Sequence, residues 1–121
     1  MATYQPTAPF IYASIPENLI VPVTFDVSVC GDLAAGTVIA KITASGLYAE
    51  YDDSQTDGRE TAVGILLEDI DSSKGDQPYL IAFGGTFYKA NLTGLDANAI
   101  TDLGAKTVSV SDSTSEDLLV F

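Results

Sequence analysis

The chain has no histidine, no tryptophan and only five basic residues, against 17 acidic ones, among its 121 residues. Histidine is the commonest general base near neutral pH, so its absence argues against acid–base enzymes. The formal net charge is −12, and the basic side chains stand singly along the chain. Nucleic-acid binding needs clustered lysine and arginine, which are missing here. We therefore expect neither an enzyme nor direct contact with DNA or RNA.

Cysteine and long apolar runs are also scarce. The single cysteine, Cys30, cannot form an internal disulfide, and we interpret it as a small buried hydrophobe near a strand end. No apolar run approaches the ~20 residues of a membrane span. No basic start followed by an apolar stretch indicates an export signal. These absences predict a soluble protein with no membrane partner.

The apolar content supports a folded domain. Hydrophobic residues make up 46% of the chain, and the mean hydropathy is +0.22, which is too apolar for a disordered acidic tail. A chain of this length forms one domain and buries roughly two-thirds of its unfolded surface. We expect this core to form without a cofactor, metal or disulfide, and the acidic residues to lie on its surface.

Residues 1–18 have the character of an extended arm that precedes a β-rich domain over residues 19–121. Three of the five prolines fall in this stretch and favour extended backbone. Apolar and aromatic side chains in an extended segment tend to dock on a surface. Two interpretations stay open, an edge strand on its own domain and docking on another chain. The candidate contact residues are Tyr4, Pro6, Pro9, Phe10, Ile11, Tyr12 and Ile15.

The remaining sequence predicts short strands. Apolar residues alternate over 19–29, where Pro22 favours a sheet edge, and residues 61–67 are apolar enough for a strand buried on both faces. Gly64 within that strand indicates a bulge or a close backbone approach. Further strands are expected at residues 37–42, 47–51, 79–83, 86–90, 106–110 and 118–121.

Turn signals complete the expected topology. Asp57-Gly58 marks residues 52–60 as a hairpin loop, and Gly84-Gly85 marks a second hairpin. One short helix is expected over residues 95–103, ending before Gly104. The prediction is a mainly β single domain of short strands and hairpins with one short helix.

Clustered carboxylates are the remaining chemical signal. The segment that contains Asp69, Asp71, Gly75 and Asp76 has an oxygen-rich pattern, but Lys74 lies inside it and the bidentate glutamate of a helix-loop-helix calcium site is absent. We interpret these residues as solvated loop charge and predict no catalytic, cofactor or metal site. A calcium- or glycan-binding surface module stays as the alternative function.

One ordered set of motifs resembles the lambda-type bacteriophage head decoration proteins. It begins at Ala35-Gly36-Thr37-Val38 and continues through Leu47-Tyr48-Ala49-Glu50-Tyr51, Thr56-Asp57-Gly58, Ala62-Val63-Gly64-Ile65-Leu66 and Gly85-Thr86-Phe87-Tyr88. The resemblance spans residues 32–92, about half of the chain. Each motif is common in β proteins, and their order is what carries the resemblance.

The resemblance implies a β-clip-like fold and a structural role in the virion. It implies a homotrimer on the outer surface of an expanded phage head, assembled in the host cytoplasm. An N-terminal arm would augment a strand of the major capsid protein and stabilise the capsid against internal DNA pressure. In this sequence residues 1–18 match that arm by position and character.

Overall fold

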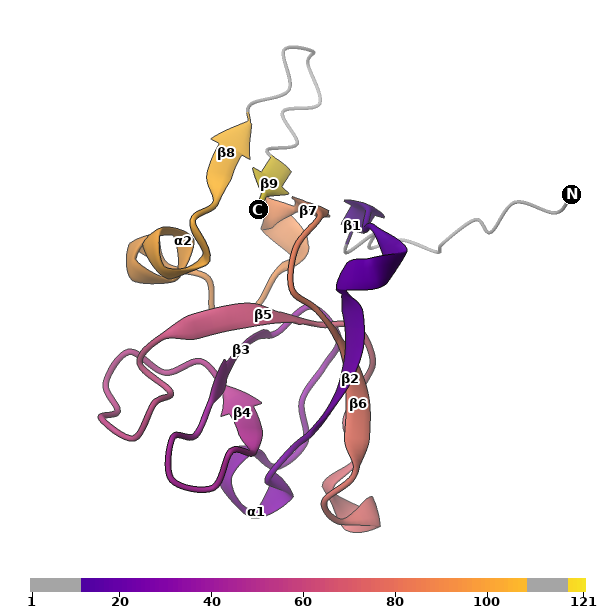
Figure 1. The fold of residues 1–121 in the computed structure, drawn as a ribbon, viewed down its shortest axis with the longest axis vertical. Coiled ribbons are helices and arrows are strands. Elements are labelled where there is room, and N and C mark those ends of the chain that lie inside the picture. The colour runs from indigo at the N-terminus through magenta and orange to yellow at the C-terminus, as the bar shows by residue number, and fades with distance from the viewer. Residues whose placement is uncertain (1–11, 109–117) are drawn as a thin grey trace, which may run out of the picture.

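The computed structural model describes residues 12–108 and 118–121. In these residues the chain forms two antiparallel sheets (Figure 1). Sheet A has four strands in the order β1-β7-β9-β8, and sheet B has five in the order β2-β6-β5-β3-β4. The strands are β1 (Tyr12–Ser14), β2 (Ile20–Thr24), β3 (Val38–Lys41), β4 (Tyr48–Glu50), β5 (Ala62–Leu66), β6 (Pro78–Ala82), β7 (Thr86–Tyr88), β8 (Lys106–Val108) and β9 (Leu118–Val120). The predicted mainly β class is confirmed.

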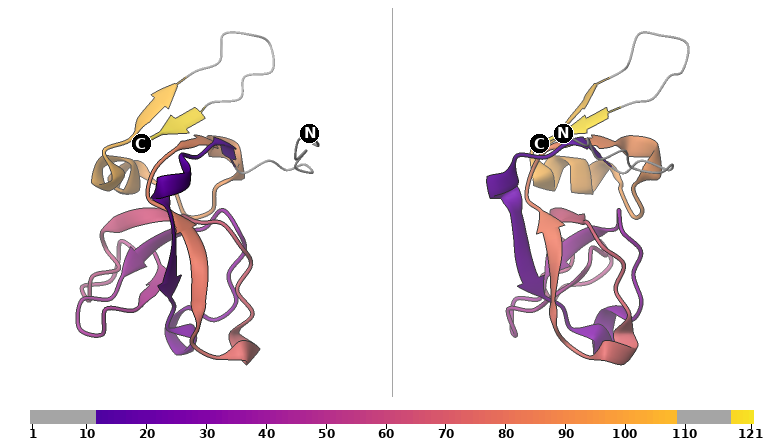
Figure 2. Two further views of the ribbon diagram at one scale, coloured as in Figure 1. Left: turned by 45° about the vertical axis from the view of Figure 1, so that its right-hand side comes forward. Right: turned by 90° about the vertical axis from the view of Figure 1, so that its right-hand side faces the viewer.

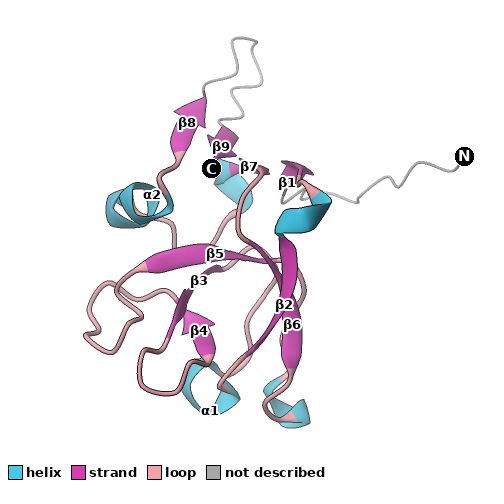
Figure 3. Cartoon of the chain, in the orientation of Figure 1, coloured by secondary structure: helices cyan, strands magenta, loops and turns pink. Residues whose placement is uncertain are grey.

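Short helices join the strands (Figure 3). They are η1 (Glu17–Leu19), α1 (Val27–Cys30), η2 (Ser72–Lys74), η3 (Lys89–Asn91) and α2 (Ala97–Leu103). The predicted helix corresponds to α2. Its first turn is capped by Asp96, and its end is formed by Gly104 in the left-handed conformation, φ 65°. In the part of the chain that the structure describes, no helix has the length and apolarity to cross a membrane.

The strand expected over residues 19–29 is wrong in its second half. β2 ends at Thr24, and the chain then forms α1. The cause is Asp26, whose carboxylate accepts hydrogen bonds from the Ser28 backbone N–H at 3.1 Å and from the Ser28 hydroxyl at 2.6 Å. This local cap competes with strand pairing. β2 is an edge strand of sheet B, as Pro22 predicts.

The hairpin expected at residues 52–60 is also wrong. β4 and β5 lie on opposite sides of β3, so this segment crosses the end of β3 instead of joining two paired strands. At the crossing, the Thr43 backbone N–H donates to the Asp57 carbonyl at 2.8 Å. Gly58 has φ +111°, and a Cβ there would collide with the Lys41 carbonyl. The Asp57-Gly58 turn is therefore part of a crossover between β4 and β5, which are not paired with each other.

The Gly84-Gly85 pair does not form a hairpin either. β6 belongs to sheet B and β7 to sheet A, so the two glycines carry the chain from one sheet to the other (Figure 2). A Cβ on Gly84 would lie 2.8 Å from the Phe121 carbonyl oxygen, and one on Gly85 would lie 2.8 Å from that of Ser14. Glycine is required here because three backbone segments meet where the sheets join.

Two apolar clusters form the core, and β3 and β5 contribute to both. Val38 and Ile65 pack with Phe87 and Leu119 of sheet A, whereas Ile39 packs with Phe25 on the other face of sheet B. Ile65 and Leu66 of β5 likewise belong to different clusters, which confirms that the predicted strand in this region is buried on both faces.

Gly64 lies at a register shift between β3 and β5, where a Cβ would be 2.6 Å from the Ala82 carbonyl oxygen. Both the predicted bulge and the predicted close approach are confirmed. Cys30 is buried as expected, although it ends α1 and not a strand, and burial raises the pKa of its thiol to about 11.

Candidate functional site

The described part of the predicted arm ends in an edge strand. β1 is the outermost strand of sheet A and pairs with β7 in the register Tyr12 to Phe87 and Ser14 to Thr86, with a bulge between the two pairs. The Tyr12 side chain is 39% exposed, one of the larger exposed fractions for an apolar residue in the described chain. An edge strand carries unpaired backbone groups that can accept another strand. β1 is therefore a candidate docking element.

The predicted contact residues do not all have the same environment. Ile15 is half-buried and packs against the apolar cluster beneath sheet A, so it contributes to the chain's own core. Tyr12 lies in β1 with much of its side chain exposed. The other predicted contact residues, Tyr4, Pro6, Pro9, Phe10 and Ile11, lie outside the described residues.

Acidic side chains are unevenly distributed over the two sheets. The four strands of sheet A contain none, and β8 contributes Lys106. Lys89, which follows β7, donates to the Thr107 hydroxyl of β8 at 3.5 Å. In the part of the chain that the structure describes, most acidic residues lie instead in the loops that connect the strands of sheet B. The α1 and η2 loops lie at the opposite end of the molecule from sheet A (Figure 2).

The carboxylates of the suspected calcium loop bind backbone N–H groups. Asp69 accepts from Ala35 at 2.9 Å, Asp76 from Val27 at 3.0 Å, and Asp71 from Ser73 at 3.0 Å. Such bonds satisfy loop and helix-start donors. Among residues 12–108 and 118–121, no group of three or more histidine, cysteine, aspartate or glutamate residues could hold a metal ion.

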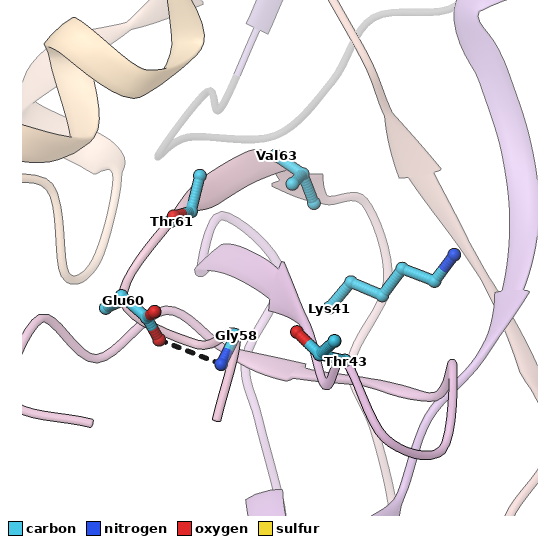
Figure 4. A pocket seen from close by; sticks show the side chains of 6 residues that line it. All are labelled: Lys41, Thr43, Gly58, Glu60, Thr61 and Val63. Carbon is cyan, nitrogen blue, oxygen red and sulfur yellow. Dashed lines mark hydrogen bonds between the residues drawn. The ribbon is translucent and has the colours of Figure 1, made fainter. Parts of the chain in front are cut away.

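A surface pocket of about 360 Å³ lies between the end of β3 and the start of β5 (Figure 4). Its lining residues are Lys41, Thr43, Gly58, Glu60, Thr61 and Val63. Between two of these residues, the Gly58 backbone N–H donates to Glu60 Oε1 at 2.8 Å. The Lys41 ammonium lies 5.9 Å from the centre of the Tyr48 ring and extends away from Glu60 (Figure 4). The sequence does not predict this pocket, because the crossover that forms it carries the same Asp-Gly turn signal as a hairpin.

The geometry defines a small acidic β protein with an edge strand on a sheet whose strands carry no acidic side chain. The family model for bacteriophage lambda head decoration protein D matches residues 21–112. The chain belongs to this family of structural phage capsid proteins, and the resemblance drawn from residues 32–92 is confirmed. Searches of curated proteins and of solved structures returned no match. The family supports a role in decorating the phage capsid.

Proposed function

We propose that the chain is a structural virion protein that binds the outside of an expanded phage head as a homotrimer. Its N-terminal arm augments a strand of the major capsid protein, and the bound trimer stabilises the capsid against the pressure of packaged DNA. Membership of the head decoration family supports the role. The observation that carries the arm hypothesis is the position of β1, the continuation of the arm, as the outermost strand of sheet A.

Strand addition explains how such an arm would bind. Main-chain hydrogen bonds to a partner's sheet edge supply affinity, and alternate side chains determine register. Burial of Phe10, Ile11 and Tyr12 would add about 25 cal/mol per Å² of apolar surface, before the cost of ordering the arm. Three arms on one trimer raise the effective concentration of the second and third contacts. The function is association without chemical turnover.

The charge distribution supports an orientation for the bound protein. Three chains carry 3 × −12 = −36, and this charge opposes nonspecific association between trimers. The strands of sheet A carry no acidic side chain, so they add no negative charge to a surface that faces the shell. We place sheet A toward the shell and the acidic loops of sheet B toward solvent.

Truncation tests the arm. Because Tyr12 to Ser14 pair with β7 and Ile15 packs on the core, the variant removes residues 1–11 and keeps β1. We expect it to melt cooperatively and to lose binding to expanded heads in a co-sedimentation assay. A matched control replaces residues 1–11 by a Gly-Ser sequence of equal length, so that lost contacts are separated from lost length. Full binding by both variants would contradict the arm hypothesis.

Light scattering tests the oligomer. At micromolar concentration we expect a mass of 3 × 12.7 = 38.1 kDa. A mass of 12.7 kDa, that of one chain, would contradict the trimer. The measurement uses the isolated protein, so it is independent of head binding. The trimer hypothesis and the arm hypothesis can therefore be rejected separately.

A further inference from the structure

Asp57-Gly58 is the sole Asp-Gly pair in the sequence. At such a pair the glycine nitrogen can attack the aspartate side-chain carboxyl carbon, because no Cβ hinders its approach. The new C–N bond closes a succinimide ring and one water molecule leaves. Water then adds to a ring carbonyl and reopens the ring, often as isoaspartate, in which the backbone runs through the former side chain. No oxidant, reductant or other co-reactant is needed.

The fold requires glycine at this reactive position. Gly58 has φ +111°, a region that L side chains rarely adopt. A Cβ there would collide with the Lys41 carbonyl and lie 2.6 Å from the Thr43 hydroxyl oxygen. The crossover over β3 therefore requires glycine directly after Asp57. A larger residue at position 58, which would slow the attack on Asp57, would not fit.

The backbone groups that the reaction must move are held in place. The Asp57 carbonyl oxygen accepts the Thr43 backbone N–H at 2.8 Å. The attacking nitrogen of Gly58 donates its hydrogen to Glu60 Oε1 at 2.8 Å (Figure 4). Ring closure must break the bond to Glu60 Oε1, because the Gly58 nitrogen loses its hydrogen when it bonds to the Asp57 side-chain carbon.

The Asp57 carboxylate, whose side chain is 42% exposed, is held by Arg59. Arg59 Nε donates to Asp57 Oδ1 at 3.2 Å and to Oδ2 at 3.1 Å, and Arg59 Nη2 lies 3.0 Å from Oδ2. The Arg59 side chain is 14% exposed, and its Nη1 contacts Glu50 Oε1 at 3.4 Å. Hydrogen bonding from Arg59 lowers the pKa of Asp57. Ionisation disfavours ring closure, because loss of water requires the neutral acid.

We propose that Asp57-Gly58 is a latent isoaspartate site that Arg59, anchored by Glu50, holds in an unreactive geometry in the folded protein. Isomerisation would add a methylene to the backbone where the chain crosses β3. Gly58 would then leave its position against Lys41, and the bond from Thr43 to Asp57 would be lost. The conversion would loosen sheet B. The proposal is independent of capsid binding.

The test measures isoaspartate at residue 57 in the full chain during long incubation at neutral pH, by peptide mass spectrometry and enzymatic methylation of isoaspartate. We compare the folded chain, the chain in denaturant and Arg59→Gln, with Lys74→Gln as control. Lys74 is a cation near Asp71 on another loop, so the control removes the same charge elsewhere. Conversion should be several-fold faster in denaturant and in Arg59→Gln than in the folded chain or the control. Equal rates in the folded and denatured chains would overturn the proposal, as would an unaltered rate in Arg59→Gln.

A second variant, Glu50→Gln, tests the proposal if Arg59→Gln does not fold. If Arg59→Gln does not melt cooperatively, the proposal is judged on Glu50→Gln, which removes the ion pair that anchors Arg59 but retains Asp57 and Arg59. We expect isoaspartate to form faster in Glu50→Gln than in the folded wild-type chain, but more slowly than in the denatured chain. A rate equal to that of the folded wild-type chain would overturn the anchoring by Glu50.

Discussion

The Tyr51 hydroxyl donates a 2.9 Å hydrogen bond to Asp96 Oδ1, the oxygen that also accepts the Ala99 backbone N–H at 2.7 Å. One carboxylate oxygen thus caps α2 and ties it to the residue that follows β4. The Tyr51 side chain is buried, and this burial, together with the bond to Asp96, raises its pKa above the usual range. Tyr51 is therefore a neutral donor at physiological pH, and it fixes α2 to sheet B.

The two partners should differ when each is removed. Tyr51→Phe leaves the cap intact and should lower the free energy of unfolding by about 1 kcal/mol. Asp96→Ala should cost about 2–3 kcal/mol, because it removes the cap and leaves the buried Tyr51 hydroxyl without its acceptor. Urea denaturation measures both. The double variant should lose less than the sum of the two single losses, and strict additivity would show that the residues are not coupled.

Gly64→Ala tests the close approach of β5 and β6. The new methyl group would lie 2.6 Å from the Ala82 carbonyl oxygen, a backbone atom that cannot rotate away. We expect a loss of about 3 kcal/mol in urea denaturation, the upper part of the overpacking range. Gly104→Ala is the control, since no atom lies within 4 Å and the backbone has the ordinary left-handed conformation, φ 65° and ψ 30°. Its cost should be limited to backbone strain, about 1 kcal/mol. Equal losses would show that the contact at Gly64 is relieved by a small shift.

Acid should destabilise the fold through four loop carboxylates. Hydrogen bonds from Ser72, Ser54, Arg59 and Ser73 lower the pKa values of Asp32, Asp52, Asp57 and Asp71, respectively. Because the folded pKa lies below the unfolded value of about 3.9, the unfolded chain takes up protons first. The stability from these groups is present above that value and is lost as pH falls through the folded pKa.

Asp71→Asn isolates one of these groups. Asparagine keeps an acceptor oxygen for Ser73 but does not titrate. The difference in melting temperature between the wild-type chain and this variant should shrink as pH falls below about 4. A difference that is constant from neutral to acidic pH would contradict the assignment to Asp71. The comparison cancels the general effect of titrating the other acidic residues.

Head binding should survive moderate salt. Salt screens exposed charges beyond about 8 Å at physiological ionic strength, but it weakens apolar burial and strand pairing little. The five basic residues of the chain stand singly, so they should not be the main anchor. Co-sedimentation with expanded heads over a salt series measures this, with Lys106→Glu on β8 as a charge-reversal variant. A steep loss of binding with salt would contradict an anchor made by the arm.

Local signals in the sequence predicted much of the structure correctly. Gly104 ends α2, Pro22 lies in an edge strand, and Gly64 lies at both a bulge and a close contact. Each depends on the backbone properties of glycine or proline at that position, which a single sequence reveals. The family motifs predicted the class of protein, because their order along the chain is also a property of the sequence. The pocket beside Gly58 could not be predicted, because its lining comes from segments that meet through the crossover.

By itself the sequence determined the mainly β class, the helix end at Gly104, the acidic composition and the family. Tertiary structure decided where each strand pairs. Asp57-Gly58 and Gly84-Gly85 reverse or bend the chain whatever follows, but neither dipeptide specifies the partner of the next strand. β3 and β5 are buried on both faces, and each occupies a central position in sheet B. Because β3 lies between β4 and β5, the segment at residues 52–60 that connects β4 to β5 must cross β3. The charge of −12 is evident from composition, whereas the absence of acidic side chains from the strands of sheet A depends on pairing between segments far apart in the chain.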